Sequence, residues 1–194
     1  MVPDRWEAAL VAVVALFAEQ GYRATPVDDL ARVAGCSKAA LYREFGSKDA
    51  LLAAAAEPFV EEVEVLLATP AGKAGAAEDR IAVATAWLRA LGSHRASARV
   101  LLEDQDGRRS PIGQLAVDQQ RRLAARLAGR RASLLRQVRA RCALSIALLV
   151  VGELGNVPLE RLHGPVLDAM LETLTTSGER GRRLSGQQAR SSVG

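Results

Sequence analysis

The sequence is poor in cysteine and in long apolar runs, and each shortage excludes a class of protein. Its two cysteines, Cys36 and Cys142, are too few for a disulfide framework and too far apart for a CxxC pair. The uncharged apolar stretch at residues 142–152 is far shorter than the roughly 20 residues of a bilayer-spanning helix. We see no signal peptide. We therefore expect a protein of the reducing cytoplasm with no membrane partner.

Aromatic residues make up only 4% of the chain, and apolar–polar alternation between turn signals, which marks β-strands, does not occur. Alanine, leucine and arginine are abundant, and all three favour helices. The 194 residues are 49% hydrophobic, enough for a sizeable core without metal or disulfide support. The sequence therefore predicts an all-α fold of about nine helices, with no metal and no cofactor.

Start and stop signals divide the N-terminal quarter of the chain into helices. Gly21 ends an amphipathic first helix, Thr25 is the expected N-cap of the second, and Pro26 its first helical position. Ser37 and Ser47 are the expected N-caps of the third and fourth helices. The predicted helices span residues 5–20, 27–34, 38–45 and 48 to about 67.

Beyond a loop of small residues at 70–77 the helical pattern continues to residue 177. Ser110-Pro111 and Gly164-Pro165 are helix entry signals, because proline favours the first helical turn. Residues 178–194 are mainly glycine, serine, glutamine and arginine, and we expect them to form a disordered tail. The further predicted helices span residues 78–92, 95–106, 111–130, 133–154 and 165–177.

The second and third predicted helices have the form of a helix-turn-helix, in which the second helix enters the major groove of DNA. Leu41 and Phe45 are expected to anchor this helix, which leaves Lys38, Ala39, Ala40, Tyr42 and Arg43 on or near the other face. An alanine methyl can contact thymine, and an arginine can bind guanine or a phosphate. These side chains suit DNA recognition.

The same region resembles the N-terminal signature of the TetR family of bacterial transcriptional regulators. The resemblance covers residues 6–52 and implies a helix-turn-helix domain at 1–47, a helical effector-binding and dimerisation domain at 48–177, and the tail at 178–194. The residues that carry it are Gly21, Tyr22, Thr25, Asp28, Asp29, Leu30, Ala31, Ala34, Gly35, Ser37, Lys38, Leu41, Tyr42, Phe45, Ser47, Lys48, Leu51 and Leu52.

The resemblance implies a mechanism and a set of DNA contacts. A homodimer, paired through helices at about 133–154 and 165–177, would bind an inverted-repeat operator as a repressor, and a small-molecule effector would release it. Arg43 and Glu44 stand where many members have an aromatic residue and a histidine. The DNA-binding positions carried over are Thr25, Ser37, Lys38, Ala39, Ala40, Tyr42, Arg43 and Lys48.

The C-terminal part carries weaker signals. Apolar residues and one histidine are candidates for an effector pocket: Trp87, Leu91, His94, Leu102 and Leu115. A regulator controlled without a ligand remains an alternative. A helical enzyme using His94 or His163 is a remote one, because neither histidine has a second His or Cys three or four residues further on or a nucleophile motif beside it. We expect no catalytic residues.

A basic block follows residue 108. Two interpretations are open: a solvated face that pairs with Glu61, Glu62 or Glu64, or a surface that attracts an acidic effector. Its arginines are Arg121, Arg122, Arg126, Arg130, Arg131, Arg136, Arg139 and Arg141.

Overall fold

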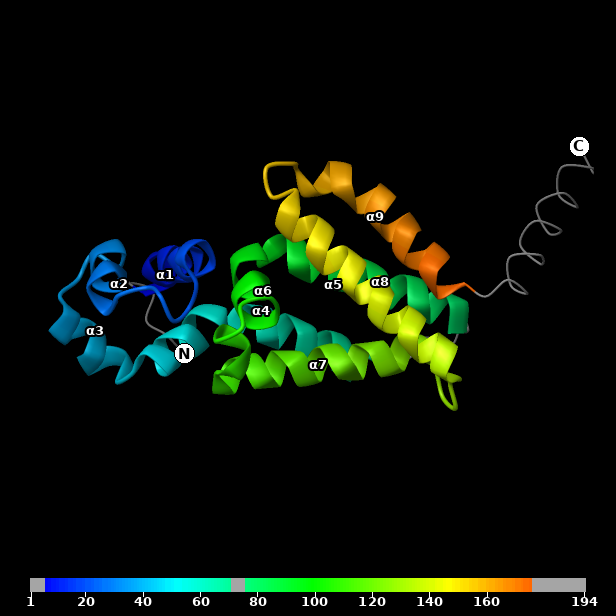
Figure 1. Cartoon of the computed structure of the whole chain (residues 1–194), viewed down its shortest axis with the longest axis horizontal. Helices are drawn as coiled ribbons and strands as arrows, with labels where there is room; N and C mark the ends of the chain where they lie inside the picture. Colours follow the sequence, from blue (N-terminus) through cyan, green and yellow to red (C-terminus); the bar gives the residue numbers. More distant parts are fainter. Residues whose placement is uncertain (1–5, 71–75, 176–194) are drawn as a thin grey trace, which may run out of the picture.

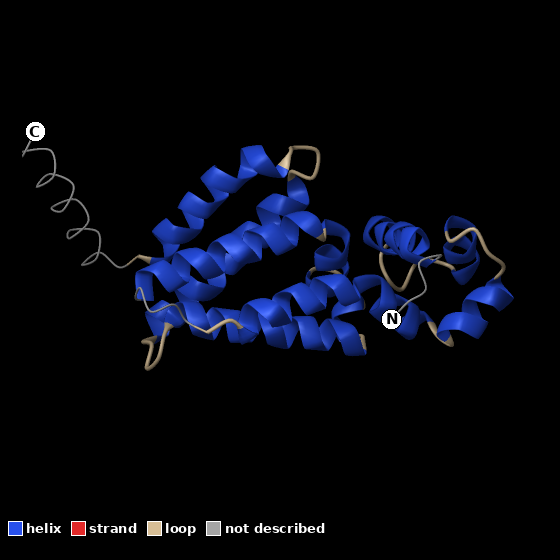
Figure 2. Ribbon diagram, turned by 180° about the vertical axis from the view of Figure 1, so that it is seen from behind, coloured by secondary structure: helices blue, strands red, loops and turns tan. Residues whose placement is uncertain are grey.

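The structure is a computed structural model, and it describes residues 6–70 and 76–175. The predicted all-α class is confirmed: these residues form nine α-helices and a short 3₁₀ turn, and no strand occurs among them (Figures 1 and 2). The helices are α1 Glu7–Gln20, α2 Val27–Val33, α3 Lys38–Phe45, α4 Lys48–Ala68, α5 Ala76–Ser93, α6 Arg95–Leu102, α7 Pro111–Ala128, α8 Leu134–Glu153 and α9 Leu159–Leu174, with the 3₁₀ turn at Gly107–Arg109. The predicted tail at 178–194 lies outside the described residues.

The molecule is elongated, with α1, α2 and α3 grouped at one end (Figure 1). Helix α4 starts beside them and runs into the larger group of helices, so it belongs to both parts. Phe17 of α1, Leu30 of α2 and Leu52 of α4 are fully buried and contribute to one continuous core. Burial of large apolar side chains of this kind contributes about 1.5–3 kcal/mol each.

The C-terminal helices form the rest of the body. Helices α8 and α9 lie side by side, and α9 follows the outer edge of the molecule (Figure 1). Trp87 of α5 lies at the centre: its ring is 6.1 Å from that of Phe59, and its indole N–H donates to the carbonyl oxygen of Leu144 at 3.4 Å. This residue ties α4, α5 and α8 together.

Two predicted helix boundaries are wrong. Helix α9 begins at Leu159 and not at 165, and Pro165 lies inside it. A proline inside a helix removes one backbone hydrogen bond, and the burial of Leu162 and Val166 on either side offsets that loss. Helix α6 ends at Leu102 and not at 106, because the chain then turns and Asp104 accepts a hydrogen bond from the Gly107 N–H at 2.6 Å.

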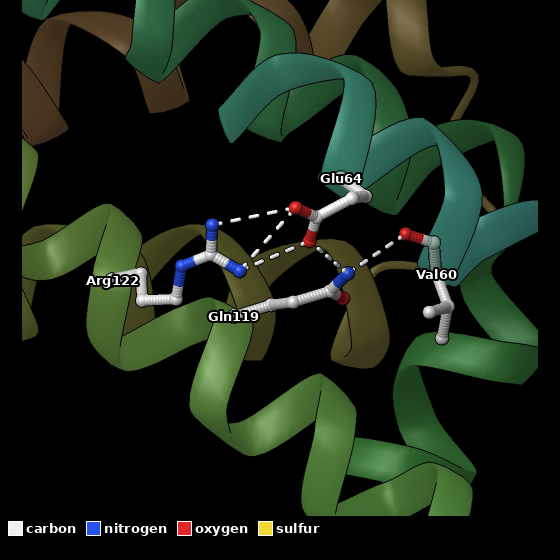
Figure 3. A network of polar contacts seen from close by, with 4 residues as sticks. All are labelled: Val60, Glu64, Gln119 and Arg122. Atoms are coloured by element: carbon white, nitrogen blue, oxygen red, sulfur yellow. Dashed lines mark hydrogen bonds and ion pairs between the residues drawn. The ribbon is translucent and has the colours of Figure 1, made fainter. Parts of the chain in front are cut away.

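Polar contacts join α4 to α7 at their centres (Figure 3). Gln119 is buried, and its amide donates to the carbonyl oxygen of Val60 at 3.0 Å and to the Glu64 carboxylate at 3.1 Å. Arg122 forms an ion pair with the same carboxylate at 3.1 Å. The hydrogen bonds from Gln119 and Arg122 lower the pKa of Glu64, and the one from Gln119 has the larger effect. The expected pairing between the basic block and α4 is therefore present at Arg122.

Arg126 has a different partner from the ones that we expected. Its guanidinium pairs with Asp79 of α5 at 2.5 Å and also donates to the carbonyl oxygens of Leu66 and Thr69. The hydrogen bond to Asp79 raises the pKa of Arg126. Because Arg122 and Arg126 are both paired with carboxylates, neither offers an unpaired charge to an acidic effector.

Candidate DNA-binding interface

The turn between α2 and α3 is tight and depends on Gly35. This residue has a φ of +66°, a conformation that side chains other than glycine rarely adopt. The Cys36 N–H donates to the carbonyl oxygen of Ala31 at 3.0 Å, which closes the turn. Ser37 then caps α3, its hydroxyl accepting a hydrogen bond from the Ala40 N–H at 3.2 Å. The short turn fixes the direction in which α3 leaves α2.

Helix α3 buries one face and exposes the other. Leu41 is buried, and the half-buried Phe45 packs edge-on against Trp6 with ring centres 5.2 Å apart. The spacing of one turn between Leu41 and Phe45 places both on the inner side. Lys38, Ala39, Tyr42 and Arg43 are exposed, and Ala40 is half-buried. The predicted recognition face thus lies on the surface.

The charged side chains on this face of α3 differ in whether they have a partner within the protein. Lys38 forms an ion pair with Asp28 of α2 at 3.2 Å. Arg43 makes no ion pair or side-chain hydrogen bond within residues 6–70 and 76–175. Glu44 is exposed as well. Arg43 therefore keeps all five N–H donors for a base or a phosphate.

Two of the eight DNA-binding positions carried over from the resemblance, Thr25 and Lys48, lie outside α3 and its N-cap. Thr25 is 1% exposed, and its hydroxyl donates to the carbonyl oxygen of Gly21 at 2.7 Å. Our prediction that Thr25 caps α2 is wrong, because Pro26 occupies the N-cap position. Thr25 instead closes the turn that follows α1, where its hydroxyl satisfies a carbonyl group at the helix end.

The Lys48 ammonium group points into the turn between α1 and α2. It donates to the carbonyl oxygens of Thr25 at 2.7 Å and Arg23 at 3.3 Å, and it lies 5.0 Å from the ring centre of Tyr22. Burial lowers the pKa of Lys48, although Asp104 and Asp49 oppose this. Two of its three donors are used inside the protein. These hydrogen bonds of Lys48 therefore stabilise the turn between α1 and α2.

Tyr22 and Asp104 have a role that the sequence did not suggest. The Tyr22 hydroxyl donates to Asp49, and burial, followed by that hydrogen bond, raises the pKa of Tyr22. The Tyr22 backbone N–H donates to Asp104 at 3.4 Å, across 82 residues of sequence. Asp104 follows α6, so this bond links the helix-turn-helix to the C-terminal helices. No sequence signal relates residues so far apart.

The five residues proposed for the effector pocket do not line one cavity. Trp87, Leu91 and Leu102 are buried core residues, whereas Leu115 is 45% exposed on α7. Among the five, only His94 borders either of the two cavities beside α4. The prediction is wrong because a buried apolar stripe has the same sequence pattern whether it packs against side chains or lines a cavity.

His94 does lie beside a second polar group. Its Nε2 is 3.1 Å from a carboxylate oxygen of Glu62, whose other oxygen pairs with Arg89. Glu62 therefore joins α4 to α5 and to the residue before α6, which is a structural role. His163 is half-buried on α9. Within the described residues no group of three His, Cys, Asp or Glu side chains could hold a metal, and no helix is long and apolar enough to span a bilayer.

A cavity of about 430 Å³ opens between the second half of α4, α5 and α7. Val65 and Leu66 of α4 and Val83 and Ala86 of α5 form much of its wall, and the Arg126–Asp79 ion pair lies at its polar side. Its size is within the range of small-molecule sites.

An exposed recognition helix on a helix-turn-helix, carried by an all-helical body, defines a DNA-binding transcriptional regulator. The sequence agrees with this class: residues 9–55 match the profile of the bacterial regulatory proteins of the tetR family. Residues 9–55 therefore carry the N-terminal DNA-binding region of the tetR-family type. The curated proteins contain no match to the sequence.

Solved structures of TetR-like and TetR-family regulators have the same fold as this chain. A TetR-like transcriptional regulator from Rhodococcus sp. RHA1 is 24% identical, with 90% of this chain and 96% of that chain aligned at a TM-score of 0.65. The TetR family regulator PfmR from Thermus thermophilus is 25% identical, with 87% and 99% aligned at 0.59. The FadR regulator from Bacillus subtilis, solved in complex with stearoyl-CoA, is 19% identical, with 88% and 100% aligned at 0.59.

Proposed function

We propose that this protein is a cytoplasmic, homodimeric repressor that binds an inverted-repeat operator and is released from it by a small molecule. The observation that carries the proposal is the exposed face of α3, where Lys38, Ala39, Tyr42 and Arg43 lie together above a buried Leu41. Arg43 and Ala39 would read base edges, and Tyr42 and Lys38 would contact phosphates. Ser37 caps α3 and Ala40 lies in its first turn, so both would also contact the DNA.

The dimer would form through α8 and α9. Helix α8 exposes Leu135, Val138 and Leu149, and the exposed Cys142 lies in line with them, because three, four and seven residues separate successive members. Such a stripe lies on one face of a helix and is the pattern by which helices pair. A twofold dimer presents two recognition helices to successive major grooves, and its operator is therefore an inverted repeat.

The effector would enter the cavity between α4, α5 and α7. Its wall includes Val65 and Leu66 of α4, the helix whose first residue, Lys48, holds the turn beside the recognition unit. A ligand that displaced the second half of α4 would act on the same rigid element as the helix-turn-helix. The stearoyl-CoA bound to the Bacillus subtilis relative supports a small-molecule ligand in this fold.

The test is selection of bound duplexes from a random DNA pool by the purified full chain. We expect one enriched sequence made of two inverted half-sites, with centres about one helical turn apart or a multiple of it. A matched selection with Arg43→Ala and Tyr42→Ala together should lose the enrichment, since both side chains are exposed and neither supports the core. Enrichment that survives this double change, or no enrichment with the unmodified chain, would contradict the proposal.

A further inference from the structure

A second cavity, of about 510 Å³, lies between α1, α4 and the first turn of α6. Its walls come from both parts of the molecule: Leu10 and Val14 belong to α1, Ala54 and Ala55 to α4, and Arg95 and Ser97 to α6. The cavity between α4, α5 and α7 shares no lining residue with it.

The side chain of Ser97 offers a hydrogen-bonding group to this cavity. Ser97 is 4% exposed and lines the cavity. Its hydroxyl has no hydrogen-bond partner in the described part of the chain. The hydroxyl oxygen is not among the described buried atoms that are sealed from solvent without a partner, so it faces the cavity. A ligand atom in the cavity can therefore bond Ser97.

Further donors lie beside Ser97. The backbone N–H groups of residues 95–97 form the first turn of α6, where a helix leaves its N–H groups without acceptors inside the helix, and the His94 side chain does not cap it. The Nε of Arg95 is buried and unpartnered, while its two other nitrogens hold the carbonyl oxygens of Gly155 and Val157. The Arg95 Nε is sealed from the cavity, so the donors on its α6 side are the Ser97 hydroxyl and the backbone N–H groups of the first turn.

The opposite walls are apolar or accept hydrogen bonds. Leu10, Val14 and Ala55 are buried apolar residues at its wall. Pro58, inside α4, has no N–H and leaves the carbonyl oxygen of Ala54 without its helical donor. Glu7 and Glu57 also border the cavity and outnumber Arg95, the one Lys or Arg among its lining residues, so a ligand with a net negative charge is disfavoured.

We infer that this junction cavity binds a neutral, mainly apolar small molecule through a carbonyl oxygen that accepts hydrogen bonds from Ser97 and the first turn of α6. A neutral carbonyl satisfies the donors of α6 without placing a charge near Glu7 and Glu57. The apolar part of the ligand replaces water against α1 and α4. The site is distinct from the proposed effector cavity and does not depend on it.

The test uses the neutral fluorescent ketone 6-propionyl-2-dimethylaminonaphthalene, titrated with the full chain and followed by the blue shift of its emission. We expect saturable binding. Ser97→Ala should weaken it about fivefold, the effect of one lost hydrogen bond. Ala54→Leu, which fills the cavity, should weaken it by about tenfold or more.

The matched control is Ala82→Leu, which adds the same side chain to the wall of the other cavity. We expect it to leave the affinity for the probe unchanged. Thermal midpoints of all variants verify that they fold, and Ser97→Ala keeps the test decisive if Ala54→Leu does not. The inference is overturned by three results: no saturable binding by the unmodified chain, affinity unaffected by Ser97→Ala, or loss of binding in Ala82→Leu with Ser97→Ala unaffected.

Discussion

The backbone N–H of Tyr22 lies 3.4 Å from the carboxylate of Asp104, and this hydrogen bond joins the turn after α1 to the loop after α6. Asp104 also accepts a hydrogen bond from the Gly107 N–H at 2.6 Å, so one carboxylate organises its own loop and binds the helix-turn-helix end of the molecule. Asp104 therefore links the loop after α6 to the turn before α2.

Asp104→Ala should lower the free energy of unfolding by about 1–3 kcal/mol, because two N–H groups lose a charged acceptor. Chemical denaturation measures this value. Asp106→Ala is the matched control, since Asp106 makes only longer ion pairs with Arg23 at 4.0 Å and Arg109 at 3.7 Å. We expect less than about 1 kcal/mol for the control. Equal losses in the two variants would show that the Tyr22 bond adds no stability.

Lys48→Met should destabilise the protein by about 1–2 kcal/mol, because the carbonyl oxygens of Thr25 and Arg23 lose their donor while the aliphatic stem is retained. DNA binding should weaken by a similar factor on every sequence. Unfolding and DNA titrations on the same sample give both numbers. Unchanged stability with weaker DNA binding would instead assign Lys48 a direct phosphate contact.

Stability above pH 10 should depend on Tyr22. The pKa of Tyr22 is raised in the folded protein, whereas the unfolded chain releases this proton near pH 10. Above that pH the unfolded state holds fewer protons than the folded state, so stability falls as pH rises. Tyr22→Phe removes this contribution. We expect urea midpoints of the unmodified chain to fall more steeply than those of the variant between about pH 9 and 11; parallel curves would contradict the assignment.

Leu149→Arg should convert the proposed dimer to a monomer, because Leu149 is 60% exposed on the stripe of α8 and a charge there would be buried in the proposed interface. Light scattering after size exclusion gives the mass. Ile81→Arg is the control: Ile81 is an exposed aliphatic residue on α5, away from that stripe. A dimeric Leu149→Arg variant, or a control that also dissociates, would place the interface elsewhere.

Local signals in the sequence were sufficient to predict most of the helices and the exposed face of α3. Ser37 and Ser47 cap the helices assigned to them, and Leu41 is buried as its spacing predicts. Pro165 gave a false start because the preference of proline for a first turn is weaker than the packing of α9 around Leu162 and Val166. Tertiary contacts decided that position.

Contacts between residues far apart in the sequence could not be predicted from local patterns. Cys142 lies in an apolar segment of α8 and is nevertheless exposed, because that face of the helix has no neighbour within residues 6–70 and 76–175. Similarly, Trp87 packs against Phe59 and lines neither cavity, whereas Ser97, a residue with no motif, borders one. Which face of a helix meets a cavity depends on crossing geometry, and no local pattern encodes that.

The most direct test of base readout by α3 is the affinity of the chain and of Arg43→Ala for a duplex carrying the selected sequence and for an unrelated duplex, by fluorescence anisotropy at ~150 mM salt. We expect the unmodified chain to prefer the selected duplex. Arg43→Ala should reduce that preference by about 5- to 150-fold, the equivalent of 1–3 kcal/mol, with a smaller change on the unrelated duplex. Equal losses on both duplexes, or no preference by the unmodified chain, would contradict base readout by the exposed face of α3.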